Sequence, residues 1–216
     1  MAKKSILLTA SLLLALFLPR LMHGQKDGFS KVMDETSFRQ KMVEITNETN
    51  AISSDFVQEK QLSFMEEPIV SEGQFFFRKD QKIRWEYESP FKYLVILKGS
   101  ELLINDEGHI NEIDLKNNKT FQEVNATINN SLQGNVWGDT KDFAPTLYQN
   151  NTQFLIQLMP LTDQMKSYLT KIEVLFNKDD YQLEEVIMYE SGGDFTKISF
   201  LNRTINPSIP DAVFEL

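Results

Sequence analysis

The segment Ser71-Glu-Gly-Gln-Phe-Phe-Phe-Arg-Lys-Asp-Gln-Lys-Ile-Arg-Trp-Glu-Tyr-Glu-Ser-Pro90 alternates between apolar and polar residues on both sides of a polar turn. Successive side chains of a β-strand point to opposite faces, so residues two apart share a face. Before the turn, Phe75 and Phe77 share one face. After the turn, Ile83, Trp85 and Tyr87 share one apolar face, and the residues between them are charged. The segment therefore predicts two antiparallel strands joined by a hairpin.

The residues that follow make both faces of the predicted sheet apolar. The alternating face continues with Tyr93, Val95 and Leu97, while Leu94 and Ile96 occupy the opposite face. Apolar side chains on both faces indicate that this part of the sheet is covered on both sides. We expect two helices to provide that cover.

Amphipathic periodicity predicts these helices. In the first, Ser37-Phe-Arg-Gln40 fits a capping box, and one apolar stripe contains Phe38, Met42, Ile45 and Ile52. The second begins after Thr120, with apolar residues at helical spacing and a glycine C-cap: Phe121, Val124, Ile128, Leu132 and Gly134. A third, short helix is expected near Asp163 to Leu169.

The rest of the chain is rich in strands and short turns. From Ser54 to Met65 the helical periodicity gives way to a pattern that favours a strand. Further strands are expected at Thr152 to Met159, Lys171 to Phe176, Gln182 to Glu190 and Phe195 to Thr204. Hairpin turns are expected at Asn105–His109, Asn177–Asp180 and Ser191–Asp194. Strands joined by short turns form an antiparallel meander, and a large twisted sheet curls. The predicted fold class is α+β: a large curved antiparallel sheet forming an unclosed barrel, with about three helices as a lid.

The N-terminus has the layout of a cleavable signal peptide. Lys3 and Lys4 precede an apolar run from Ile6 to Leu18, and Gly24 follows at the expected cleavage site. The alternative is a transmembrane anchor, but about 13 apolar residues are fewer than the roughly 20 that cross a bilayer. We expect residues 1–24 to be the signal peptide and residues 25–216 to form a single domain, exported to the periplasm.

Composition excludes several classes of protein. Removing residues 1–24 takes away three of the 22 basic residues and none of the 31 acidic ones, which leaves a net charge of −12. Such acidity argues against nucleic acid and anionic membrane surfaces as partners. The chain has no cysteine, which excludes disulfides, thiolate catalysis and the thiol that a lipid-anchored bacterial lipoprotein requires.

Candidate catalytic residues are few. His109 is the one histidine left after residue 24, and it lies in a predicted turn where a solvated side chain is the simpler explanation. The paired carboxylates at residues 66–67, 179–180 and 184–185 fit solvated faces or turns. We therefore expect no enzyme activity, no catalytic residues, no metal and no cofactor.

Three short patterns in a fixed order carry a resemblance to a known family. They are Phe56-Val-Gln-Glu-Lys60, Ser71-x-Gly-x-Phe75 and Arg84-Trp-x-Tyr87, preceded by the signal peptide and a helix. In this order they resemble the N-terminal half of LolA-family periplasmic lipoprotein carriers, and the resemblance extends to Phe214.

The resemblance implies an unclosed barrel with a helical lid that binds the acyl chains of lipoproteins. It implies an inner-membrane lipoprotein-release complex and an outer-membrane acceptor as partners of a monomer. In the family, a basic residue followed by proline latches the lid; here that pair aligns with Lys79 and Asp80, and Arg78 is a neighbouring alternative. Some relatives have an additional C-terminal strand and loop, which we expect this chain, ending at Leu216, to lack.

The concave face of the sheet is the expected ligand-binding site. Its expected lining is Phe75, Phe77, Ile83, Trp85, Tyr87, Tyr93, Val95 and Leu97, with Val124 and Ile128 from the lid. An ordinary sealed core explains each of these residues equally well. Two other functions stay open: the same fold carrying or sensing another lipid-like ligand, such as a glycolipid or lipophilic pigment, and a hydrolase that uses carboxylates.

Overall fold

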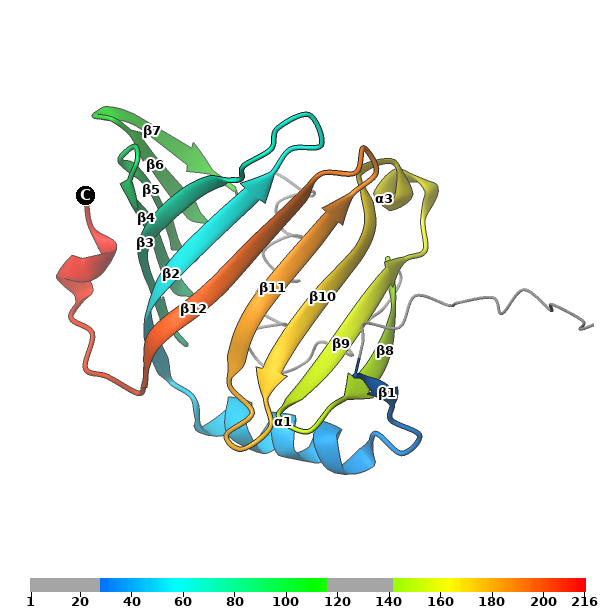
Figure 1. Ribbon diagram of the computed structural model, residues 1–216. Coiled ribbons are helices and arrows are strands. Elements are labelled where there is room, and N and C mark those ends of the chain that lie inside the picture. Colours follow the sequence, from blue (N-terminus) through cyan, green and yellow to red (C-terminus); the bar gives the residue numbers. More distant parts are fainter. Residues whose placement is uncertain (1–27, 116–141) are drawn as a thin grey trace, which may run out of the picture.

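A computed structural model describes residues 28–115 and 142–216 of the chain (Figure 1). In this part, 12 strands form one antiparallel sheet. The strands are β1 (Ser30–Lys31), β2 (Ala51–Gln61), β3 (Ile69–Arg78), β4 (Lys82–Ser89), β5 (Tyr93–Lys98), β6 (Glu101–Asp106), β7 (His109–Asp114), β8 (Phe143–Gln149), β9 (Gln153–Pro160), β10 (Leu169–Asn177), β11 (Leu183–Glu190) and β12 (Phe195–Ile205). The helices of this part are α1 (Thr36–Glu48), α3 (Asp163–Tyr168) and the 3-10 helix η1 (Asp211–Phe214).

The strand order is β1-β8-β9-β10-β11-β12-β2-β3-β4-β5-β6-β7. The sheet is unclosed, because the strands at the two ends of this order, β1 and β7, do not pair with each other. Two meanders, β2 to β7 and β8 to β12, are joined where β12 pairs with β2. The sheet curls, so that β3 to β7 turn away at the left of Figure 1, while β9 to β12 are seen face-on. The predicted α+β fold with a large, unclosed antiparallel sheet is confirmed, and so are the predicted hairpin turns.

Helix α1 lies across one end of the sheet, where it contributes to the core (Figure 1). Phe38 and Met42 are buried in a cluster with residues of β8 to β10. The predicted capping box does not form: the helix begins at Thr36, whose backbone N–H donates to the Asp34 carboxylate at 2.9 Å. Ile52 was wrongly assigned to the helical stripe, because the helix ends at Glu48 and Ile52 lies in β2.

Helix α3 lies at the opposite end of the sheet (Figure 1). Its N-cap is Thr162, whose hydroxyl accepts a hydrogen bond from the Met165 backbone N–H at 3.2 Å. The short helix expected near residues 163–169 is confirmed. The helix predicted after Thr120 and the signal peptide lie outside the described residues. We call the two ends of the sheet the α1 end and the α3 end.

The outer face of β3 to β6 is covered by the C-terminal segment, residues 206–216. Leu94 and Ile96 are buried in a cluster with Ile209 and Phe214, and Phe214 has no exposed surface. The prediction that two helices cover this face was wrong for α1, which packs elsewhere. A distant segment provides the cover, and no helical periodicity in the sequence marks it.

Charged groups hold the C-terminal segment on the sheet. The Arg78 guanidinium donates to the Ile209 carbonyl at 2.9 Å, forms an ion pair with Asp211 and lies 5.3 Å from the centroid of the Phe214 ring. Lys82 donates to Asp211 at 2.8 Å. Arg78 therefore contacts the C-terminal segment on the outer face, and its role as an alternative latch stays a prediction because the predicted lid lies outside the described residues.

Candidate functional site

The inner face of β2 to β6 is built from three rows of residues that run across the strands in register. The α1-side row is entirely apolar and consists of Ile52, Phe77, Ile83, Leu97 and Leu102. The central row consists of Ser54, Phe75, Trp85, Val95 and Ile104. The α3-side row consists of Phe56, Gly73, Tyr87, Tyr93 and Asp106. The face thus becomes more polar from the α1 end toward the α3 end.

Aromatic rings cluster around Trp85 in the central row. Its ring centroid lies 4.9 Å from that of Phe56, 5.2 Å from Phe75 and 6.1 Å from Phe200. Phe56 has 1% of its surface exposed and packs against Tyr87 in a T-shaped arrangement at 5.1 Å. Such edge-to-face pairs add to the stabilisation from burial.

Polar groups mark the α3 side of this face. The Tyr87 hydroxyl donates to the Gln58 side-chain oxygen at 2.9 Å. Further toward the α3 end, Lys60 forms an ion pair with Glu190 across β2 and β11. Burial raises the pKa of the Tyr87 hydroxyl, because it disfavours the charged phenolate, so this group is neutral and a hydrogen-bond donor at pH 7.

The structure brings eight of the ten predicted lining residues together on this inner face. Phe75 and Phe77 come from β3, and the others come from β4 and β5: Ile83, Trp85, Tyr87, Tyr93, Val95 and Leu97. All but Tyr93 belong to one apolar cluster or pack directly against it. Val124 and Ile128 lie outside the described residues.

The sequence prediction missed residues of the same face that lie on other strands. Phe56 and Leu102 are buried in the same cluster, and Ile198 joins it from β12. A second cluster continues the inner face along β8 to β10 under α1, with Leu147, Phe154, Ile156 and Phe176. Alternation within each strand marks these residues as facing one side, but only the pairing of β12 with β2 shows that it is the same side.

Lys79 links the end of β3 to the C-terminal end of α1. Its ammonium group donates to the Asn47 carbonyl in the last turn of α1 at 3.1 Å, and its backbone N–H donates to the Asn50 carbonyl at 2.8 Å. A cation at a helix C-terminus interacts favourably with the helix dipole. The latch role of Lys79 stays a prediction, because its family counterpart acts on a lid.

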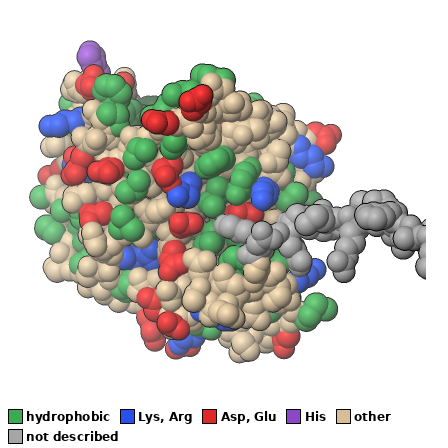
Figure 2. Space-filling view, in the orientation of Figure 1, with side chains coloured by type: hydrophobic (Ala, Val, Ile, Leu, Met, Phe, Trp, Pro, Cys, Tyr) green, Lys and Arg blue, Asp and Glu red, His purple; other side chains and the backbone are tan. Residues whose placement is uncertain are grey.

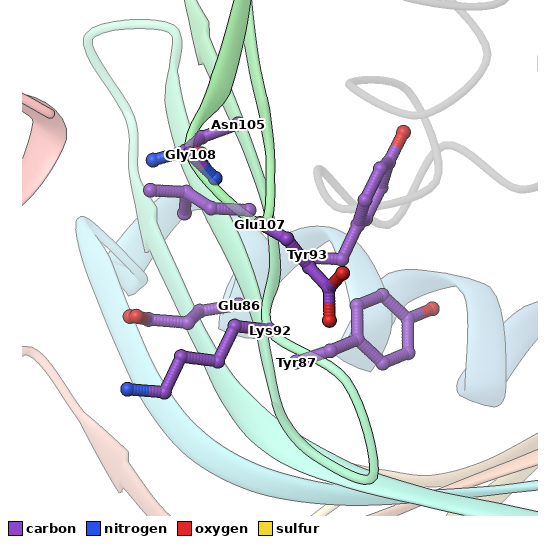
Figure 3. Close-up of a pocket in the computed structure, with 8 residues that line it drawn as sticks. Glu86, Tyr87, Lys92, Tyr93, Asn105, Glu107 and Gly108 are labelled. Atoms are coloured by element: carbon purple, nitrogen blue, oxygen red, sulfur yellow. Dashed lines mark hydrogen bonds between the residues drawn. The ribbon is translucent and has the colours of Figure 1, made fainter.

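A pocket of about 320 Å³ opens at the α3 end, beside the turn between β6 and β7 (Figure 3). Tyr87 and Tyr93 line it together with polar and charged groups: Glu86, Lys92, Asn105 and Glu107. The two tyrosines point away from Glu86 and Lys92 (Figure 3). The pocket therefore adjoins the polar edge of the inner face rather than its apolar floor.

Large apolar side chains are exposed at the α3 end. Phe64 in the β2–β3 loop, Phe91 in the β4–β5 loop and Tyr168 in α3 are 81%, 69% and 67% exposed. Elsewhere, on the side seen in Figure 2, hydrophobic side chains are scattered among acidic and basic ones. Near α1, Met33 is 90% exposed as well, so exposed apolar side chains occur at both ends of the sheet.

No cluster of three or more acidic or histidine side chains in residues 28–115 and 142–216 is placed to hold a metal ion. His109 is exposed beside the β6–β7 turn, with its Nδ1 atom 3.2 Å from the Asp106 carbonyl oxygen. The helices in the described ranges are too short or too polar to cross a membrane.

Comparison with solved structures finds the same fold in distant proteins. The MucA/MucB complex of Pseudomonas aeruginosa has a TM-score of 0.53 at 10% identity, covering 85% of this chain and 61% of that chain. An uncharacterised conserved protein from Thermus thermophilus has a TM-score of 0.52 at 8% identity, covering 85% and 94%. A LolA superfamily protein from Nitrosomonas europaea has a TM-score of 0.46 at 11% identity, covering 86% and 99%.

No curated protein matches the chain in sequence. The family model described as outer membrane lipoprotein carrier protein LolA matches residues 47–216, which extend from the end of α1 to the last residue. This match includes all the strands that form the three rows of the inner face. The chain belongs to the LolA family.

Proposed function

We propose that the protein is a periplasmic carrier that shields the acyl chains of lipoproteins against the inner face of its unclosed sheet. The observation that carries the proposal is this apolar face in a LolA-family chain: a fully apolar α1-side row, an aromatic centre at Trp85 and a polar α3 side. An amphiphile with hydrocarbon chains and a polar head has the same order of polarity.

Acyl chains need a carrier of this kind to cross an aqueous compartment. Each methylene that enters water costs about 0.8 kcal/mol, so acyl chains leave a membrane slowly unless a protein surface replaces the membrane interior. The sheet offers that surface without closing around it. A sheet whose strand order, within the described residues, ends at β1 and at β7 can widen for a ligand more easily than a closed barrel, in which every strand is paired on both sides.

Docking at the α3 end completes the proposed route. The exposed Phe64, Phe91 and Tyr168 surround the polar end of the inner face, where a lipid head group and the attached protein would emerge. We infer that this end receives lipoproteins from an inner-membrane release complex and presents them to an outer-membrane acceptor. The carrier acts as a monomer after export and removal of residues 1–24, and it binds its cargo rather than transforming it.

Uptake of a fluorescent fatty acyl probe by the purified protein tests the proposal. We expect saturable binding with increased probe fluorescence, and we expect Trp85→Glu to weaken it at least about tenfold, since a carboxylate in an apolar face must be desolvated. The matched control is Leu201→Glu, which places the same charge on the exposed outer face of β12. Circular dichroism verifies that each variant is folded, and absence of uptake by the folded wild-type protein would overturn the proposal.

A second candidate keeps the fold and changes the cargo. It is favoured by the similarity to the MucA/MucB complex, in which a protein of this fold is bound to another protein. In this case the domain carries or senses another ligand, such as a glycolipid, a lipophilic pigment or a mislocalised lipoprotein. Mass spectrometry of the molecules that co-purify from the native host distinguishes these cargoes from lipoproteins in transit.

A further inference from the structure

The indole N–H of Trp85 is a buried donor without an acceptor. Among residues 28–115 and 142–216, one buried side-chain nitrogen or oxygen has no hydrogen-bond partner, and this atom is Trp85 Nε1. The hydroxyl of Ser54, in the same row, donates to the Leu201 carbonyl at 2.8 Å. A buried tryptophan N–H usually has a partner, and one that lacks it calls for an explanation.

The neighbouring hydroxyl does not provide that acceptor. Tyr87 is close enough to Trp85 for the indole N–H to oppose the rise in the pKa of Tyr87 that burial causes. The two groups do not meet the distance and angle of a formed hydrogen bond, and the Tyr87 hydroxyl donates to Gln58. Tyr87 is therefore at most a weak, poorly aligned acceptor for the indole, which can donate to a better placed acceptor on a bound ligand.

Trp85 lies at the boundary between the apolar and polar parts of the inner face. Toward the α1 end, its neighbours in the next row are Phe77, Ile83 and Leu97. Toward the α3 end come Tyr87 and Tyr93, and beyond them Gln58 and Lys60. A bound amphiphile with its hydrocarbon in the first region and its head in the second places the atoms that link the two beside the indole.

We propose that Trp85 Nε1 donates a hydrogen bond to the ester carbonyl oxygen of a bound acyl chain, so that the site selects acyl esters over ether-linked chains. An ester carbonyl is an acceptor without a donor, and the indole is a donor without an acceptor, so the two are complementary. The inference rests on the proposed carrier function and adds the chemical group that the site recognises. Both the diacylglyceryl group of a lipoprotein and a phospholipid supply such an ester.

A cycle of two proteins and two ligands isolates this hydrogen bond. The ligands are a diacylated S-glyceryl-cysteine peptide and its dialkyl ether analogue of equal chain length, each titrated against wild type and Trp85→Phe in competition with the fluorescent acyl probe. We expect wild type to bind the ester about tenfold more tightly than the ether. In Trp85→Phe the two affinities should become equal, because the indole N–H is gone while an aromatic ring remains.

The control variant is Phe75→Leu, which removes aromatic volume from the same row without removing a donor. It should weaken the ester and the ether by the same factor. The same measurements with diacyl and dialkyl phosphatidylethanolamine separate the two sources of the ester, and the tighter of the two ester ligands identifies the source.

A direct readout uses the indole ¹H–¹⁵N resonance of Trp85, assigned by its loss in Trp85→Phe. The ester should shift this resonance downfield, and the ether should not. Equal binding of ester and ether by wild type, or an equal loss of both in Trp85→Phe, would overturn this inference while leaving the carrier function intact. Failure of the folded wild type to bind any of the four lipids would instead overturn the carrier function.

Discussion

Gly73 shows how a single residue shapes the candidate binding face. A Cβ atom at this position would lie 1.8 Å from the Glu86 carbonyl oxygen and 2.9 Å from the Phe56 ring. The residue lies at a register shift between β3 and β4, where the neighbouring strand approaches closely. Glycine therefore allows the Phe56 ring to lie against β3 and to reach Trp85 and Tyr87.

We expect Gly73→Ala to lower the free energy of unfolding by about 3 kcal/mol, because the backbone of β4 must move to accommodate the methyl group. Urea denaturation measures the change. Gly192→Ala is the matched control, since a Cβ atom at Gly192 meets no atom within 4 Å, and its effect should stay within about 0.5 kcal/mol. Similar stabilities of the two variants would contradict the close approach at Gly73.

At the scale of elements, the C-terminal segment depends on charges that titrate in acid. Lys82 first, and then Arg78, lowers the pKa of Asp211, and Arg78 holds the pKa of Asp80 far below its usual range. A carboxylate whose pKa is lower in the folded state stabilises that state above its unfolded pKa, near 3.9, and this contribution is lost as the pH falls further. The segment is therefore held less firmly in acid.

Hydrogen exchange at the backbone amides of Val213 and Glu215, which are bonded within the segment, should accelerate below about pH 4 relative to amides of β10. Asp211→Asn should accelerate it already at neutral pH and weaken its dependence on acid. Glu112→Gln, on the exposed edge strand β7, removes a carboxylate away from the segment and should leave the exchange unchanged. Equal acid responses in wild type and Asp211→Asn would refute the role of these ion pairs.

The elements themselves could be predicted to different extents from the sequence. Strands with period-two alternation, such as β3, β4 and β11, and turns rich in glycine and aspartate were found, because the signal lies within neighbouring residues. The start of α1 was missed because Asp34 rather than Ser37 provides the side-chain acceptor. The cover of Leu94 and Ile96 was missed because residues 209–214 lie more than 100 positions away and have no repeating pattern.

For the whole molecule, the carrier proposal predicts that ligand and fold stabilise each other. A ligand that binds only the folded state raises the free energy of unfolding by about 2.7 kcal/mol at 100 times its dissociation constant. The melting temperature should therefore rise with the concentration of the diacylated peptide. Trp85→Glu should reduce the rise and Leu201→Glu should keep it; an equal rise in both variants would indicate binding away from the inner face.

The sequence by itself determined that the chain forms an antiparallel sheet whose strands have a continuous apolar face, and it identified eight residues that the structure places on that face. Side-chain alternation and turn residues are local properties, so they can be read without knowing what lies across the sheet. Only the tertiary structure decided that β12 pairs with β2, which continues the apolar face across strands distant in sequence. It also decided that the C-terminal segment covers the outer face and that the Trp85 N–H is left unpaired. These features depend on contacts between residues far apart in the chain, which no local pattern specifies.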